Sequence, residues 1–155
     1  MADEAGPVGL IGLGLIGTSL AKRLLARGFA VHGYDVVPER CANLERLGGR
    51  ALTSARDVGR ACRTVVLAVF DTPQVESVLE AEGGLEPQPG QVVVCTSTCD
   101  PDRIAVLGER IAARGVRFVE APLSGNSDQI GLGNGVAMVG AERAPMEVAG
   151  AGLGR

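Results

Sequence analysis

The sequence lacks the features that mark several large classes of protein. No apolar run reaches the roughly 18 residues that a membrane-spanning helix needs. The formal net charge is −3 and the cationic residues are spread along the chain, so no basic surface for nucleic acid is expected. The first residues, "MADEAGP", are acidic and lack the basic region of a signal peptide. We therefore expect a cytoplasmic protein that binds neither nucleic acid nor membranes.

The sequence also has few residues that could hold a metal or carry redox chemistry. Its four cysteines, Cys41, Cys62, Cys95 and Cys99, show no CxxC spacing and have no histidine partner nearby. Neither a zinc site nor a thioredoxin-like site is therefore expected, and the thiols are interpreted as reduced and mostly structural. His32, the only histidine, lies inside an apparent strand, which favours a structural role over a catalytic one.

What the chain does have is a regular alternation of apolar runs with helical patterns. Its 155 residues are 46% hydrophobic and 21% charged, the balance of a single globular domain over residues 1–155. Strands are expected at 7–12, 29–35, 51–53, 64–70, 91–98, 116–122 and, after a looser stretch, in an apolar run at 136–140; helices are expected at 16–26, 38–49, 54–62, 72–84 and 100–115. This order predicts a Rossmann-type α/β fold, a doubly wound, mainly parallel sheet with helices on both faces.

A glycine motif stands between the first expected strand and the first expected helix. Gly12, Gly14 and Gly17 form G-x-G-x-x-G, which is weak evidence alone because glycine-rich turns are common. The position of the motif strengthens this evidence, since a dinucleotide-binding loop joins a strand to a helix. There the three glycines allow the tight turn, the approach of the backbone to the pyrophosphate, and the packing of the helix on the strand. The first amides of the helix, those of Leu15 and Ile16, would face the phosphates.

Asp35 extends this motif and bears on which dinucleotide is bound. It ends the second expected strand, 18 positions after Gly17. A carboxylate there accepts a hydrogen bond from the ribose 2′-hydroxyl of NAD and repels the 2′-phosphate of NADP. Val36 and Val37 stand where a phosphate-binding arginine could have followed, although Arg40 could swing toward a phosphate. The pattern favours NAD over NADP; the alternative is that Asp35 is only a turn residue at a strand end.

Three stretches together resemble one known family. The opening "VGLIGLGLIGTSLAKRLLARGFAVHGYD" is similar to the glycine loop, first helix and second strand of the β-hydroxyacid dehydrogenases. "TSTCDPD" (96–102) is similar to the Ser-Ser-Thr-x-x-Pro segment of that family, and "VEAPLSGN" (119–126) to its Asp-Ala-Pro-Val-Ser-Gly-Gly signature. The family includes 3-hydroxyisobutyrate dehydrogenase and, more distantly, 6-phosphogluconate dehydrogenase. The resemblance implies that Thr98 lies beside the nicotinamide and that Ser124 and Gly125 hold the substrate carboxylate. It also makes Phe70 and Asp71, in "VFDTP", cofactor candidates.

Each of these assignments has a simpler structural alternative. Phe70 could be a core residue, Thr98 could belong to the capping of the following helix beside Asp100, and Ser124 could be part of a turn. These alternatives stay open at the level of sequence.

The chain also departs from the family pattern in two places. Asn126 stands where the family has the second glycine of its signature, and an amide there would enter the substrate pocket or reshape its loop. The family's general acid/base is a lysine in a following helical domain, which the 155 residues do not include. Lys22, the only lysine, is interpreted as a surface residue of the first helix.

The resemblance therefore implies the NAD-binding domain of an oxidoreductase that transfers a hydride between the nicotinamide and a small β-hydroxy acid. These 155 residues are expected to bind the cofactor without turning over substrate by themselves, and the full-length protein could form a homo-oligomer. Two alternatives remain: a stand-alone NAD-binding sensor or interaction module, and an enzyme similar to imine reductases.

Overall fold

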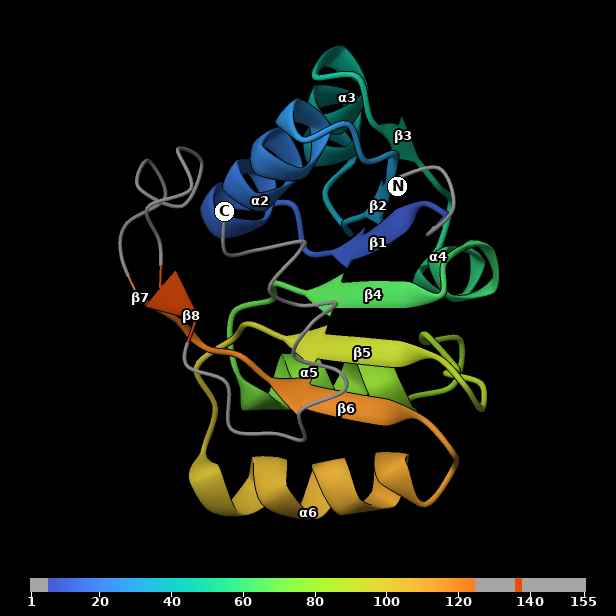
Figure 1. Ribbon diagram of the computed structural model, residues 1–155, viewed down its shortest axis with the longest axis vertical. Coiled ribbons are helices and arrows are strands. Elements are labelled where there is room, and N and C mark those ends of the chain that lie inside the picture. The colour runs from blue at the N-terminus through green and yellow to red at the C-terminus, as the bar shows by residue number, and fades with distance from the viewer. Residues whose placement is uncertain (1–5, 125–135, 138–155) are drawn as a thin grey trace.

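The computed structural model describes residues 6–124 and 136–137, which form a central sheet between two layers of helices (Figure 1). Six parallel strands lie in the order β3-β2-β1-β4-β5-β6. They are β1 (Val8–Ile11), β2 (Val31–Tyr34), β3 (Arg50–Ala51), β4 (Thr64–Leu67), β5 (Val92–Cys95) and β6 (Arg117–Glu120). The order reverses at β1, as in doubly wound dinucleotide-binding folds, so the predicted fold class is confirmed.

Five helices connect these strands within the described residues: α2 (Leu15–Ala26), α3 (Pro38–Arg46), α4 (Ala55–Ala61), α5 (Thr72–Glu80) and α6 (Pro101–Ala112). A separate antiparallel pair, β7 (Leu123–Ser124) and β8 (Val136–Ala137), follows β6. This pair lies past the carboxyl ends of the parallel strands, at the left of Figure 1. The short β8 falls inside the apolar run expected at 136–140.

Each face of the sheet has its own apolar core. On one face Leu24 of α2 and Leu44 of α3 pack against strand residues. On the other face Val58, Val75 and Ile111 come from α4, α5 and α6. Because helices cover both faces, the central strands are buried on both sides, which explains why they are continuous apolar runs in the sequence. At the carboxyl ends of the strands, connecting loops rather than helices border the sheet.

The ends of several elements agree with the sequence signals. The Ser54 hydroxyl accepts a hydrogen bond from the Asp57 amide at 3.0 Å and so caps α4. Pro38 is the first residue of α3. Gly28, just after α2, has a φ of +88°, the left-handed conformation that ends many helices.

The strands are shorter than the apolar runs suggest. The runs at 64–70 and 91–98 are strands only as far as Leu67 and Cys95, the expected strand at 51–53 is Arg50–Ala51, and α2 begins at Leu15 rather than at residue 16. For β4 the physical cause lies at Gly12, where a φ of +98° turns the chain away from the sheet at the end of β1. After Ile11, β1 no longer pairs with β4, and the apolar residues that follow Leu67 lie in a loop.

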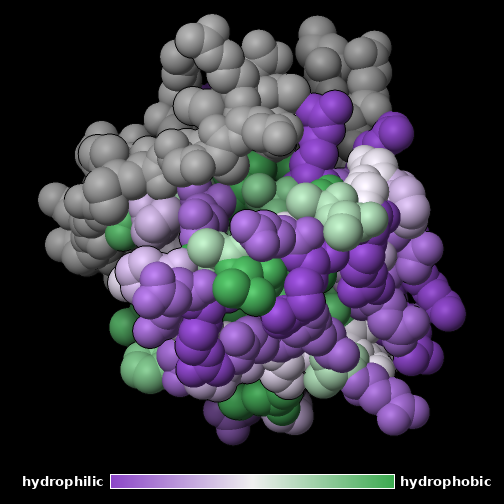
Figure 2. Space-filling view, turned by 90° about the horizontal axis from the view of Figure 1, so that it is seen from below, coloured by the Kyte–Doolittle hydropathy of each residue, from purple (hydrophilic) through white to green (hydrophobic). Residues whose placement is uncertain are grey.

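The outer face of α6 carries charged side chains together with the half-exposed Val106. Arg110 pairs with Glu80 at 2.6 Å and Arg103 pairs with Glu76, so two ion pairs join α5 and α6. Seen from below, this face is mostly hydrophilic, with small apolar areas (Figure 2). None of the helices in the described part of the chain has the length and apolar character to cross a bilayer.

His32 and the acidic and thiol side chains form no metal centre in the part of the chain that the structure describes. His32 lies in β2 beside Arg50 of β3. Partial burial, and then the positive charge of Arg50, lower the pKa of its imidazole below the usual value. A neutral, half-buried histidine in a strand agrees with the structural interpretation.

Candidate functional site

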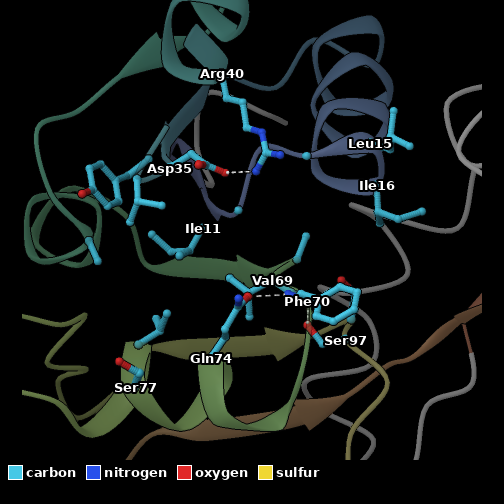
Figure 3. A pocket seen from close by; sticks show the side chains of 18 of the residues that line it. Ile11, Leu15, Ile16, Asp35, Arg40, Val69, Phe70, Gln74, Ser77 and Ser97 are labelled. Carbon is cyan, nitrogen blue, oxygen red and sulfur yellow. Dashed lines mark hydrogen bonds and ion pairs between the residues drawn. The ribbon is translucent and has the colours of Figure 1, made fainter. Parts of the chain in front are cut away.

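A cleft of about 860 Å³ opens at the carboxyl edge of the sheet, between α2 and α5 (Figure 3). Its walls come from the β1–α2 loop, the end of β2, the side of α3 and the loops that follow β4 and β5. Ligands of open α/β sheets bind at this edge, where the strand order reverses. The volume is in the range of sites that enclose a whole small ligand.

The three glycines of the motif are required for different physical reasons. A Cβ on Gly12 would lie 2.5 Å from the carbonyl oxygen of Ala68, and one on Gly17 would lie 1.9 Å from that of Gly12. Both positions therefore need glycine for packing within the protein. A Cβ on Gly14 would meet only Nη1 of Arg40, at 3.9 Å. Packing does not require glycine at Gly14, so the open space beside it points to the approach of a ligand.

The N-terminus of α2 is arranged to receive an anion. Its N-cap residue is Gly14, which supplies no side-chain cap, and no acidic residue lies in the first turn. The three helices α4, α5 and α6, in contrast, each have a side-chain cap. The first amides of any helix have no partner within the helix and carry partial positive charge. Because Leu15 and Ile16 line the cleft, these uncapped amides stand at its wall.

Asp35 lies at the end of β2 with its carboxylate fixed by the main chain. Oδ2 accepts a hydrogen bond from the Leu13 amide and Oδ1 accepts one from the Val37 amide, both at 2.8 Å. Nη1 of Arg40 lies 3.5 Å from Oδ2 (Figure 3). Asp35 therefore does hold the turn, as the simpler alternative required, but it also lines the cleft. Through Leu13 it ties the glycine loop to β2.

Three exposed apolar side chains line the same cleft. Leu15 is 81% exposed, Val36 is 81% exposed and Phe70 is 84% exposed. Leu15 comes from α2, and Phe70 from the loop after β4 (Figure 3). Exposed apolar groups gathered at one site mark a binding surface. The alternative that Phe70 belongs to the core is therefore wrong, because the chain leaves β4 before Phe70.

The loop after β4 is stabilised by a local network. The Phe70 amide donates to Oε1 of Gln74 at 2.7 Å, and the Gln74 amide donates to Oδ1 of Asp71 at 3.0 Å. Asp71 is thus the N-cap of α5. Phe70 and Gln74 line the cleft, whereas Asp71 is not among its lining residues. In this arrangement Asp71 positions the loop and Phe70 faces the cleft.

These different roles predict different effects of two substitutions. Phe70→Ala should raise the Kd for the dinucleotide that the glycine motif predicts about tenfold, because about 1.5 kcal/mol of apolar burial on binding is lost. Its free energy of unfolding should stay within about 0.5 kcal/mol of the wild-type value. Asp71→Ala should lower that free energy by about 1 kcal/mol through loss of the helix cap, with little change in Kd. Calorimetric titration and thermal unfolding of both variants measure this; the reverse pattern would contradict the assignment.

The loop after β5 offers one hydroxyl to a ligand. The Thr96 and Ser97 hydroxyls donate to main-chain carbonyl groups at the end of β4, at 2.8 Å and 2.6 Å. Thr98 is exposed, lines the cleft and makes no hydrogen bond with a described residue. The cap of α6 is Asp100, which accepts from two amides of the first turn. The alternative that Thr98 takes part in this cap is therefore wrong.

Of the predicted substrate residues, the structure describes only Ser124. Ser124 ends β7, and its main chain alone is described. Gly125 and Asn126 lie outside the described residues, so the structure places neither of them. Leu123, just before Ser124, lines the cleft. Lys22 is exposed on α2 and is not among the lining residues.

The sequence arguments missed several lining residues. Gln74, Ser77 and Val78 of α5 face the cleft, and Ala55 at the start of α4 joins them. Helical spacing could have found the first three, because α5 begins directly after the loop that carries Phe70 and residues three or four apart share a face. Ala55 gives no such signal, since a small apolar residue at a helix start is common.

Comparison with known proteins gives one family and a consistent set of relatives. A family model described as the NAD binding domain of 6-phosphogluconate dehydrogenase matches residues 7–153. L-threonate dehydrogenase of Cupriavidus necator is 34% identical over 81% of this chain, and human mitochondrial 3-hydroxyisobutyrate dehydrogenase is 32% identical over 86% of it. The chain spans 43% and 40% of the lengths of these two enzymes.

The same likeness extends to a solved structure. The crystal structure of 3-hydroxyisobutyrate dehydrogenase from Salmonella typhimurium superposes with a TM-score of 0.87 and 28% identity, over 96% of this chain and 52% of that one.

Proposed function

Because the chain belongs to the family of NAD-binding domains of 6-phosphogluconate dehydrogenase, we propose that its cleft holds the NAD of a β-hydroxyacid dehydrogenase. The observation that carries the proposal is the N-terminus of α2. It has no side-chain cap and no acid in its first turn, and it begins at a glycine that packing does not require. Such an end fits a pyrophosphate, since an anion supplies the missing partner of the first amides.

The residues around the cleft fit the other parts of the dinucleotide. Gly12, Gly14, Leu15, Ile16 and Gly17 would hold the pyrophosphate. Gly17 does this indirectly, by letting α2 pack on the loop. Val36 and Phe70 offer exposed apolar surface to the adenosine and the linking riboses.

For the choice of dinucleotide, we propose NAD over NADP. The buried carboxylate of Asp35 is fixed by two amides, so it is ready to accept a hydrogen bond from the ribose and would repel a 2′-phosphate. Arg40 is half-exposed and already pairs with this carboxylate. To bind a phosphate it would have to leave that pair, which leaves NADP the weaker ligand.

For the reacting end, the free hydroxyl of Thr98 would orient the nicotinamide. Ser124 and Gly125 would hold the carboxylate of a small β-hydroxy acid, with Asn126 beside them. Bound NAD would supply the chemistry, by accepting a hydride at its ring from the carbinol carbon. The residues of this chain bind and orient; a base that takes the hydroxyl proton is still needed.

That requirement leads to a prediction about activity. Lys22, the only lysine of the sequence, is exposed and outside the cleft, so the 155 residues offer no family-type lysine to the substrate. We propose that they form one cofactor-binding domain, and we expect no hydroxy-acid-dependent NADH formation near the usual range of about 1 to 1,000 per second. Absorbance of NADH with a panel of small β-hydroxy acids measures the rate. A rate in that range would contradict the proposal, and NAD binding without turnover would support it.

Imine reductases would need a different proton donor, and a sensor would need none, so binding of NAD alone does not separate these alternatives. A hydroxy acid that tightens NAD binding to this chain would favour the dehydrogenase assignment. Cytoplasmic location and homo-oligomerisation of the full-length protein stay predictions.

A further inference from the structure

Two of the four cysteines lie side by side at the cleft loop. Sγ of Cys95 and Sγ of Cys99 are 4.0 Å apart. Cys95 ends β5 and is 1% exposed, whereas Cys99 is only partly buried. The residues between them, 96–98, are the segment that lines the cleft. Sequence spacing gave no reason to pair these thiols, because CxxxC is not a recognised redox motif.

We propose that Cys95 and Cys99 form a disulfide when the protein meets hydrogen peroxide, and that this bond weakens binding of the nicotinamide cofactor. The first part stands on the geometry of the two thiols alone. The second part rests on the proposed function, because it takes the cleft to be the cofactor site.

The reaction uses one peroxide molecule and releases two waters. Sγ of Cys99 attacks one peroxide oxygen, the O–O bond breaks, and the departing hydroxide takes the thiol proton to form the first water. Sγ of Cys95 then attacks the sulfenic sulfur of Cys99, the S–O bond breaks, and the departing hydroxide leaves as the second water with the proton of Cys95. The two sulfur atoms are oxidised and the two peroxide oxygens are reduced.

The surroundings decide the order of the two steps. Burial raises the pKa of the Cys95 thiol to about 12, so this thiol is neither accessible nor ionised enough to meet the oxidant first. Cys99 is the more accessible sulfur and takes that role. The attack by Cys95 is then the slower step.

We expect that closing the bond shifts the loop rather than the strand. The sulfur atoms have to approach from 4.0 Å to the roughly 2.05 Å of a disulfide. Cys95 is held in the sheet, where its carbonyl oxygen accepts the Ala121 amide at 2.8 Å. Cys99 therefore moves toward Cys95 and takes Thr98 with it. This displaces the one hydroxyl of the loop that is free for the cofactor.

A peptide mass measurement tests the disulfide. Trypsin releases Cys95 and Cys99 together in the peptide 64–103, while Cys41 and Cys62 fall in other peptides. After limited hydrogen peroxide, under non-reducing conditions, this peptide should lose the mass of two hydrogen atoms, and dithiothreitol should restore them. Cys99→Ser should abolish the loss, and Cys62→Ala should keep it. Gain of oxygen atoms on Cys99 in place of the loss would overturn the proposal.

A titration of the same samples tests the consequence. The Kd for NAD should rise about tenfold in the oxidised protein, equal to about 1.4 kcal/mol, and return after reduction. In Cys99→Ser the Kd should not respond to peroxide, which also controls for oxidised methionine. An unchanged Kd in a protein whose peptide shows the disulfide would overturn the link to the cofactor. If the reduced protein binds no NAD, the proposed function fails, while the mass result still decides the disulfide.

Discussion

Gly17→Ala is expected to lower the free energy of unfolding by about 3 kcal/mol, the upper end of the usual cost of overpacking. The reason is the 1.9 Å between a Cβ at this position and the carbonyl oxygen of Gly12. Neither group is the end of a flexible side chain, so α2 itself has to move away from the loop. For a domain of this size the melting temperature should fall by about 6–12 °C. Thermal unfolding followed by circular dichroism measures the change.

Gly14→Ala is the matched control for this substitution. It adds the same methyl group three residues earlier, at the N-cap of α2, where the nearest atom is Nη1 of Arg40 at 3.9 Å. The free energy of unfolding should change by less than about 1 kcal/mol. Equal losses of stability in the two variants would show that the packing of the loop differs from the structure described.

Asp35→Ala is expected to have the largest effect on cofactor choice. The Kd for NAD should rise about tenfold to a hundredfold, because a hydrogen bond to a charged group, worth about 1.5–3 kcal/mol, is lost. The Kd for NADP should rise much less, since the repelling carboxylate is lost as well. Stability should also fall by about 1–3 kcal/mol because the buried amide of Leu13 is left unpaired, with a smaller loss at the half-buried amide of Val37. Titrations with both dinucleotides give the ratio of the two Kd values.

Asp100→Ala is the control that tests whether a loss of stability alone changes the choice between NAD and NADP. Asp100 also accepts two main-chain amides, both at 3.0 Å, but it caps α6 and is not among the lining residues of the cleft. This variant should lose stability while keeping the wild-type ratio of the Kd values for NAD and NADP. A wild-type preference for NADP, or an unchanged ratio in Asp35→Ala, would contradict the assignment of Asp35.

The sequence was sufficient for the order of the elements and for the glycine loop. Parallel strands buried on both faces are continuous apolar runs, and Ser54, Pro38 and Gly28 mark helix ends by local chemistry that hardly depends on the rest of the fold. The same local chemistry fails where a strand ends. Phe70 has the apolarity of a core residue, and only the three-dimensional position of the strand end shows that it is exposed.

The roles of side chains within the loops could not be predicted from the sequence either. Thr96, Ser97 and Thr98 are three similar hydroxyls in a row, yet two of them bond to the end of β4 and one does not. Which hydroxyl is free depends on how β4 and β5 lie side by side, and spacing along the chain does not encode this. The pairing of Cys95 with Cys99 depends in the same way on the bend after β5.

The proposed function requires the glycine loop at the start of α2 to bind the pyrophosphate of NAD. Calorimetric titration of the wild-type chain and of Gly14→Ala with NAD tests it most directly. We predict saturable binding of one NAD per wild-type chain, with a Kd between about 1 µM and 1 mM, the usual range for such ligands. In Gly14→Ala, still folded, we predict binding at least about tenfold weaker, because the added methyl group occupies the place of the phosphate. No saturable binding by the wild-type chain, or equal affinity in the two proteins, would contradict the claim.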